Sequence, residues 1–138
     1  MKKVKFVVII NDISNVVDKL VGEMILGSLK TEFETRKEVG VEGVRLSNLI
    51  GVEIMPDCLL NQCSYDKIVL ICEKNTATFF LDVCEIIHNA ELWVCNWGER
   101  HLFSINKTGE NKIFYTDQEI IDEALSLVSA PSSKRSAA

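Results

Sequence analysis

The sequence predicts an α/β protein, a three-layer Rossmann-like domain with a mostly parallel sheet of four to five strands and helices on both faces. Two observations support this fold class. The apolar runs Phe6–Ile10 and Ile68–Cys72 have the length of strands and contain no polar residue, which is typical of strands covered on both sides. Each run is followed by a segment with capping residues and helical apolar spacing, and strands that alternate with helices form parallel sheets.

Composition places the chain among globular proteins, since 47 % of its 138 residues are hydrophobic and 25 % are charged. We expect one domain over residues 1–130 and a disordered tail over residues 131–138, which are small and polar. The net charge of −5 opposes binding to nucleic acid or to an anionic membrane, because both require a basic face. The first apolar run is too short for a signal peptide and no run is long enough to span a membrane, so we expect a cytoplasmic protein.

The first strand is predicted at Val4–Ile10, where an apolar run ends at a polar Asn-Asp pair. A helix follows and runs to about Lys30. Its buried face is expected to hold the apolar residues that recur at helical spacing, namely Val16, Val17, Leu20, Val21, Met24, Ile25 and Leu29.

Further strands are predicted along the rest of the chain. Residues 31–43 are polar and charged and receive no element, whereas Val52–Met55 is predicted as a short strand near an edge of the sheet. The runs Asp66–Cys72, Glu91–Cys95 and Lys112–Tyr115 complete the set of strands.

Two more helices connect and follow these strands. Asn75 or Thr76 caps the first of them, and Asn89 closes it. Thr116 and Glu119 form a capping box that opens the last helix. The inner face of this last helix is predicted to consist of Ile120, Ile121, Ala124, Leu125 and Val128.

Ligands of open parallel sheets bind at the carboxyl ends of the strands, beside a change in strand order. This rule selects the loops that follow the predicted strands and gives the candidate ligand-binding residues Asn11, Asp12, Asn75, Asn96, Trp97 and Gly98. The alternative for Asp12 is a role as an ordinary turn residue. No glycine-rich phosphate loop and no nucleophile elbow occurs, which argues against a nucleotide hydrolase, a typical dehydrogenase and an α/β-hydrolase.

Cys95 and His101 are the candidate catalytic residues. Cys95 ends a predicted strand, where a helix N-terminus would lower the pKa of its thiol and make it a nucleophile; the alternative is an inert, buried cysteine. His101 could act as a base or a phosphoryl acceptor, or lie on the surface without a role. The five cysteines are an odd number without paired metal-ligand spacing, so we expect reduced thiols, no metal and no cofactor.

Residues 67–128 resemble the second half of the mannose- and sorbose-type enzyme IIB domain of the sugar phosphotransferase system. The resemblance lies in a strand, a helix, a strand leading into Asn96-x-Gly98, a stretch with Gly109, and a strand that precedes Asp117 and a final helix. That family implies a phosphoryl carrier, and His101 would be the acceptor here. The family's own histidine lies in an N-terminal Asp-Arg-Leu-x-His-Gly-Gln loop, whereas this chain has no histidine before residue 88.

The segment from Asn89 to Cys95, with the strand and closing helix that follow it, is similar to the C-terminal half of the DsrE-like sulfur-relay family. A cysteine at a strand end is common in that family, so this resemblance implies a thiol-based sulfur carrier that uses Cys95.

The residues themselves favour a third function, a small module that binds a ligand or a protein partner at the strand ends, because they contain no complete catalytic constellation. The sulfur-relay protein and the phosphoryl carrier remain the alternatives. Self-association stays open, since a short edge strand and small helices leave apolar surface to cover.

Overall fold

A computed structural model of the chain describes residues 3–13, 16–48, 65–73, 76, 90–95, 111–114 and 116–129. The elements within these ranges are β1 (Val4–Ile10), α1 (Val16–Phe33), β2 (Val39–Arg45), the short 3-10 helix η1 (Leu46–Asn48), β3 (Lys67–Glu73), β4 (Ala90–Cys95), β5 (Asn111–Phe114) and α5 (Asp117–Ser129). None of the helices in these ranges is long and apolar enough to cross a membrane.

The strands form one five-stranded sheet in the order β2-β1-β3-β4-β5, and every neighbouring pair is parallel. In the register of the sheet, Val4 of β1 lies opposite Val39 of β2 and Lys67 of β3. The prediction of a mostly parallel sheet of four to five strands is therefore confirmed, as is the Rossmann-like α/β class.

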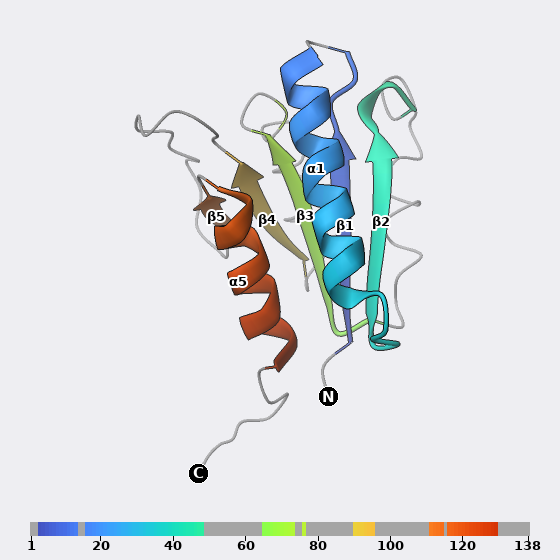
Figure 1. Ribbon diagram of the computed structural model, residues 1–138, viewed down its shortest axis with the longest axis vertical. Helices are drawn as coiled ribbons and strands as arrows, with labels where there is room; N and C mark the ends of the chain where they lie inside the picture. The colour runs from blue at the N-terminus through green and yellow to red at the C-terminus, as the bar shows by residue number, and fades with distance from the viewer. Residues whose placement is uncertain are drawn as a thin grey trace.

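Helices α1 and α5 lie over the same face of the sheet (Figure 1) and contact each other. The buried side chains of this layer alternate along the strands with those of the opposite face, as the pleat of a strand requires. They are Val4, Phe6, Val8, Ile10, Ile25, Leu29, Phe33, Val39, Val69, Ile71, Trp93, Cys95, Phe114, Ile120, Ala124 and Val128.

On the opposite face Lys5 pairs with the half-exposed Glu42 of β2, and a second apolar cluster is buried. Its side chains are Val7, Ile9, Leu46, Ile68, Leu70, Cys72, Leu92 and Val94. The helix predicted between Asn75 and Asn89 lies outside the described residues, except for Thr76. The prediction of helices on both faces of the sheet therefore stays a prediction.

A row of four aromatic rings runs along one face of the sheet, from α1 to β5. Phe33 of α1 stacks on Phe6 of β1 with 5.6 Å between ring centroids, and Phe6 lies 5.8 Å from the indole of Trp93. Trp93 in turn lies 5.0 Å from the ring of Phe114 on β5. Aromatic pairs at these separations add stabilisation beyond the area they bury, so this row links the first helix to the last strand.

The predicted buried face of α1 is only partly right. Ile25 and Leu29 are buried as expected, but Val17 and Leu20 are exposed, as are Val16 and Met24. The helix is apolar on two sides, and the side that packs on the sheet is the one that carries Gly22. A Cβ at Gly22 would lie 3.3 Å from the Cα of Ile10, so the missing side chain allows α1 to approach β1 closely.

Residues 31–43 receive no element from the sequence pattern, so the edge strand β2 is not predicted. Gly40 and Gly43 lower the β propensity of this segment. Both glycines have a packing reason, since a Cβ at Gly40 would lie 2.6 Å from Tyr65 Oη and one at Gly43 would lie 2.5 Å from a methyl group of Leu26. The edge strand predicted at Val52–Met55 lies outside the described residues.

The ends of the other elements agree with the prediction to within a few residues. Helix α1 extends to Phe33 rather than Lys30, because the ring of Phe33 packs on Phe6. At the start of α5 the backbone N–H of Glu119 donates to Thr116 Oγ1 at 3.2 Å, which confirms this half of the capping box.

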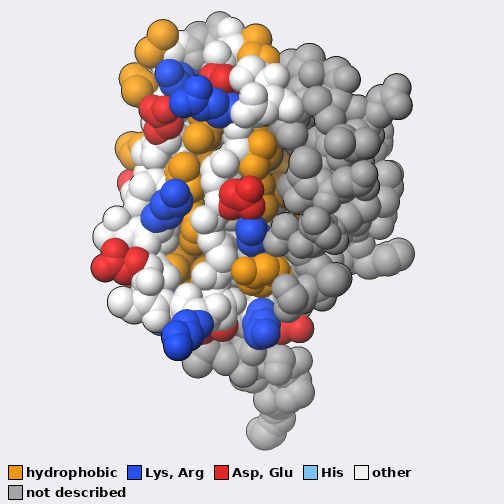
Figure 2. Space-filling view, turned by 90° about the vertical axis from the view of Figure 1, so that its right-hand side faces the viewer, with side chains coloured by type: hydrophobic (Ala, Val, Ile, Leu, Met, Phe, Trp, Pro, Cys, Tyr) orange, Lys and Arg blue, Asp and Glu red, His pale blue; other side chains and the backbone are white. Residues whose placement is uncertain are grey.

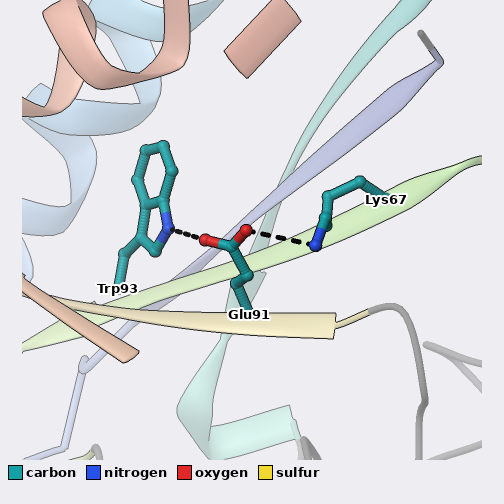
Figure 3. A network of polar contacts seen from close by, with 3 residues as sticks. All are labelled: Lys67, Glu91 and Trp93. Atoms are coloured by element: carbon teal, nitrogen blue, oxygen red, sulfur yellow. Dashed lines mark hydrogen bonds and ion pairs between the residues drawn. The ribbon is translucent and has the colours of Figure 1, made fainter. Parts of the chain in front are cut away.

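A buried ion pair lies at the amino ends of β3 and β4 (Figure 3). The indole Nε1 of Trp93 donates to Glu91 Oε1 at 2.7 Å, and Lys67 Nζ lies 3.2 Å from Glu91 Oε2. The Glu91 carboxylate thereby receives a partner at each oxygen, which offsets the free-energy cost of taking its charge out of water.

We expect Glu91→Ala to lower the free energy of unfolding by about 3 kcal/mol, because it leaves the Lys67 ammonium and the Trp93 N–H without their buried acceptor. Urea denaturation followed by circular dichroism measures this loss. The matched control is Glu42→Ala, since Glu42 also pairs with a lysine, Lys5, but has a side chain that is 51 % exposed against 5 % for Glu91. This control should lower the free energy of unfolding by less than about 1 kcal/mol. Equal losses for the two variants would contradict a stabilising role of the buried Glu91 contacts.

Candidate functional site

The strand order changes direction at β1, which has β2 on one side and β3 on the other. The carboxyl ends of the parallel strands lie at one end of the sheet, which we call the carboxyl edge. The chain leaves both β1 and β3 there and continues in different directions. This is the place where open α/β sheets form a crevice for ligands. The residues at this edge are Asn11 and Asp12, which follow β1, and Glu73, which ends β3.

A buried hydrogen-bond network joins the two strand ends. Asn11 Nδ2 donates to Glu73 Oε1 at 3.2 Å, and Thr76 Oγ1 donates to the same oxygen at 2.6 Å. Asn11 Oδ1 accepts a further bond at 3.2 Å from the backbone N–H of Ile13. Asn11, Glu73 and Thr76 are all buried, so the network fixes the backbone that leaves both strands.

Asp12 lies next to this network but nearer the surface, where it binds the segment after β2. Its two carboxylate oxygens accept from Ser47, one from the backbone N–H at 3.0 Å and one from Oγ at 2.6 Å. The side-chain hydrogen bond from Ser47 is the main reason that the pKa of Asp12 is lowered, and the charge of Arg45 adds to the effect. Asp12 therefore presents a fixed negative charge at the edge of the sheet at neutral pH.

A small cavity of about 10 Å³ lies beneath this edge, between α1 and the ends of β1, β3 and β4. Its polar lining comes from Asp18, Glu73 and Cys95. The volume is about that needed by one water molecule, so a larger ligand would have to bind at the surface of the edge rather than between α1 and the sheet.

Cys95 ends β4, as predicted, and its thiol is buried. Removal from water raises the pKa of this thiol, and the negative charge of Glu73 raises it further. Both effects are opposite in direction to the lowering that a nucleophilic thiolate needs. The geometry therefore favours the alternative of a structural cysteine. Cys72, on the opposite face of the sheet, is also a buried cysteine.

Of the predicted site residues, the structure brings Asn11 and Asp12 together at the β1 edge and places Cys95 two strands away, with Glu73 between them in the sheet. The remaining candidates lie outside the described residues, and they are Asn75, Asn96, Trp97, Gly98 and His101.

The rule on strand ends selects the loop from Glu73 to Thr76, but it gives only Asn75 of that loop as a ligand-binding residue, and it does not select Ser47. Glu73 carries a usable signal, because it is the acidic residue that directly follows a buried apolar run. Ser47 carries none, since it lies 35 residues from Asp12 and only the β1–β2 pairing brings the two together.

The described parts of the chain hold no group of three or more histidine, cysteine, aspartate or glutamate side chains arranged for a metal ion. No protein-family model matches the chain, and comparisons with curated proteins and with solved structures find no match either. The resemblances to the enzyme IIB and DsrE-like families therefore remain predictions.

We expect Cys95 to react with iodoacetamide at pH 7.5 more than about 100-fold more slowly in the native protein than in 6 M guanidinium chloride, because the thiol becomes accessible only when the fold opens. Peptide mapping by mass spectrometry measures the rate at this cysteine. Glu73→Gln is the matched variant and should leave the reaction slow, since burial is the larger cause of the raised pKa. A native rate close to the unfolded one would restore the nucleophile hypothesis.

We also expect Ser47→Ala to raise the pKa of Asp12 toward its ordinary value by removing the side-chain hydrogen bond. A depressed folded-state pKa stabilises the fold above the unfolded-state pKa, and this contribution disappears as pH falls through the folded-state value. Ser47→Ala should therefore make stability less sensitive to acid in this range. Carbon-detected NMR titration of the Asp12 carboxyl tests the shift, and Ser126→Ala on α5 should leave it unchanged.

Proposed function

We propose that this chain is a small binding module that takes a polar ligand at the carboxyl edge of its sheet, between β1 and β3. The observation that carries the proposal is the meeting of Asn11, Asp12 and Glu73 at the change in strand order, each held by a defined hydrogen bond. Side chains fixed in this way lose little conformational entropy when a ligand binds.

The charges at the edge indicate the chemistry of the ligand. Asp12, Asp18 and Glu73 carry carboxylates there, and Arg45 at the end of β2 lies near enough to Asp12 to lower the pKa of its carboxyl. Carboxylates accept hydrogen bonds and repel anions. A ligand with several hydroxyl or amino donors, such as the ribose of a nucleoside, therefore fits this edge better than a phosphate group does.

A catalytic function has less support. The sulfur-relay alternative requires a reactive thiolate, and burial of Cys95 works against one. The phosphoryl-carrier alternative requires His101, which lies outside the described residues. Neither alternative has an observation in the described residues that favours it over a binding function.

The test is a titration of the isotopically labelled chain with adenosine, guanosine, cytidine, uridine and free ribose, followed by amide NMR. We expect at least one of these compounds to shift the amides of residues 11–13, 46–48 and 73 and to leave those of α5 unchanged. Asp12→Asn should weaken binding about 10-fold or more, because a hydrogen bond to a charged acceptor contributes roughly 1.5–3 kcal/mol.

The matched control is Asp122→Asn, which neutralises an exposed aspartate of α5 that accepts a surface hydrogen bond from Gln118. This variant should bind as tightly as the original chain. Shifts that cluster away from the β1–β3 edge, or binding that is insensitive to Asp12→Asn, would contradict the proposal.

A further inference from the structure

The outer side of α1 carries a row of exposed apolar residues that the packing of the chain does not explain. Five large side chains form it, and they are Ile13 (51 % exposed), Val16 (68 %), Val17 (67 %), Leu20 (57 %) and Met24 (43 %). We call this set the α1 stripe. It lies on the side of the helix opposite the buried residues Ile25 and Leu29.

The α1 stripe is continuous and uncharged. Hydrophobic side chains protrude at the upper left of the space-filling view, on the α1 side of the molecule (Figure 2). Five side chains exposed to this degree amount to on the order of a few hundred Å² of apolar surface, which is as large as the biggest patch on a typical monomer. Surface of this size in one place indicates an interface rather than scattered exposure.

A groove between α1 and α5 adjoins the α1 stripe at Met24. Its volume is about 630 Å³, and it begins at Met24, which also belongs to the α1 stripe. Ile121 and Leu125 of α5 supply its apolar wall, and both are only partly buried. The groove also carries the acidic side chains of Glu32 and Asp117, so the apolar interface is the α1 stripe alone, and its area falls below the roughly 800 Å² per partner of a standard interface.

The spacing within the stripe indicates which partner fits. Val17, Leu20 and Met24 of α1 follow one another at intervals of three and four residues, the pattern by which two helices pack along a seam, and Ile13 lies in the turn that precedes the helix. The row continues through Gly27 and Thr31, so no charge interrupts it. A seam of this kind is complementary to another copy of itself.

From these observations we propose that the α1 stripe is the interface of a homodimer, in which the α1 helices of two copies pack antiparallel about a twofold axis. In that arrangement Val17 of one copy faces Leu20 of the other, on both sides of the twofold axis. A twofold interface uses the same patch on both copies, and here every facing pair is apolar. The proposal does not depend on the ligand site at the β1–β3 edge.

Sedimentation velocity of the full chain from about 1 to 500 μM tests the proposal. We expect a reversible monomer–dimer equilibrium with a dissociation constant in the micromolar range, because the patch is small for a tight dimer. Leu20→Glu places two charges in the interface and should raise the dissociation constant more than about 100-fold. Glutamate is a good helix former and position 20 is exposed, so the variant should keep its circular dichroism spectrum and melting temperature as a monomer.

The matched control is Ser126→Glu, which adds the same charge at an exposed position of α5 outside the stripe and the groove. It should dimerise like the original chain. Isotope-filtered NMR on a mixed-label sample should give contacts between the methyl groups of Val17 in one copy and Leu20 in the other. A chain that stays monomeric at 500 μM, or a dimer that Leu20→Glu does not weaken, would overturn the proposal.

Discussion

Burial of the sheet on both faces is the constraint on which the rest of the structure depends. The side chains of β1 and β3 have almost no contact with water on either side, so their backbone groups must pair within the sheet. Polar chemistry is thereby confined to the strand ends. Asn11, Asp12 and Glu73 gather at the carboxyl ends, while Lys67 and Glu91 pair at the amino ends.

The two ends of the sheet use their buried carboxylates in different ways. Glu91 has a lysine and an indole N–H as partners, and it lies beneath the aromatic row that holds the sheet to its helices. Glu73 instead receives bonds from neutral groups, Asn11 and Thr76, and it lies beside a cavity that leads toward the edge. The first arrangement stabilises a charge within the sheet, and the second fixes the ends of β1 and β3 against each other beside Asp12.

Strand patterns predicted most of the fold, because buried parallel strands consist of apolar runs and three of the five strands, β1, β3 and β4, have such a run. The sequence was less informative wherever contacts between residues far apart in the chain decide which side of an element is buried or whether a strand forms. Gly22 selects the buried side of a helix that is apolar on two sides, and the glycines of β2 make way for Tyr65 and Leu26. For the site, Asn11 and Asp12 could be predicted from their place after a strand, but Ser47 could not, since only the parallel pairing of β2 brings it to Asp12.

The aromatic row has a consequence for how the chain acquires its structure during synthesis. Phe6 and Phe33 are synthesised before Phe114 and the buried residues of α5. Until they emerge, the indole of Trp93 has no cover from the last strand, and the nascent sheet exposes apolar surface and an open edge. The aromatic row can therefore close only after β5 has been synthesised, and until then the unfinished sheet is prone to aggregation.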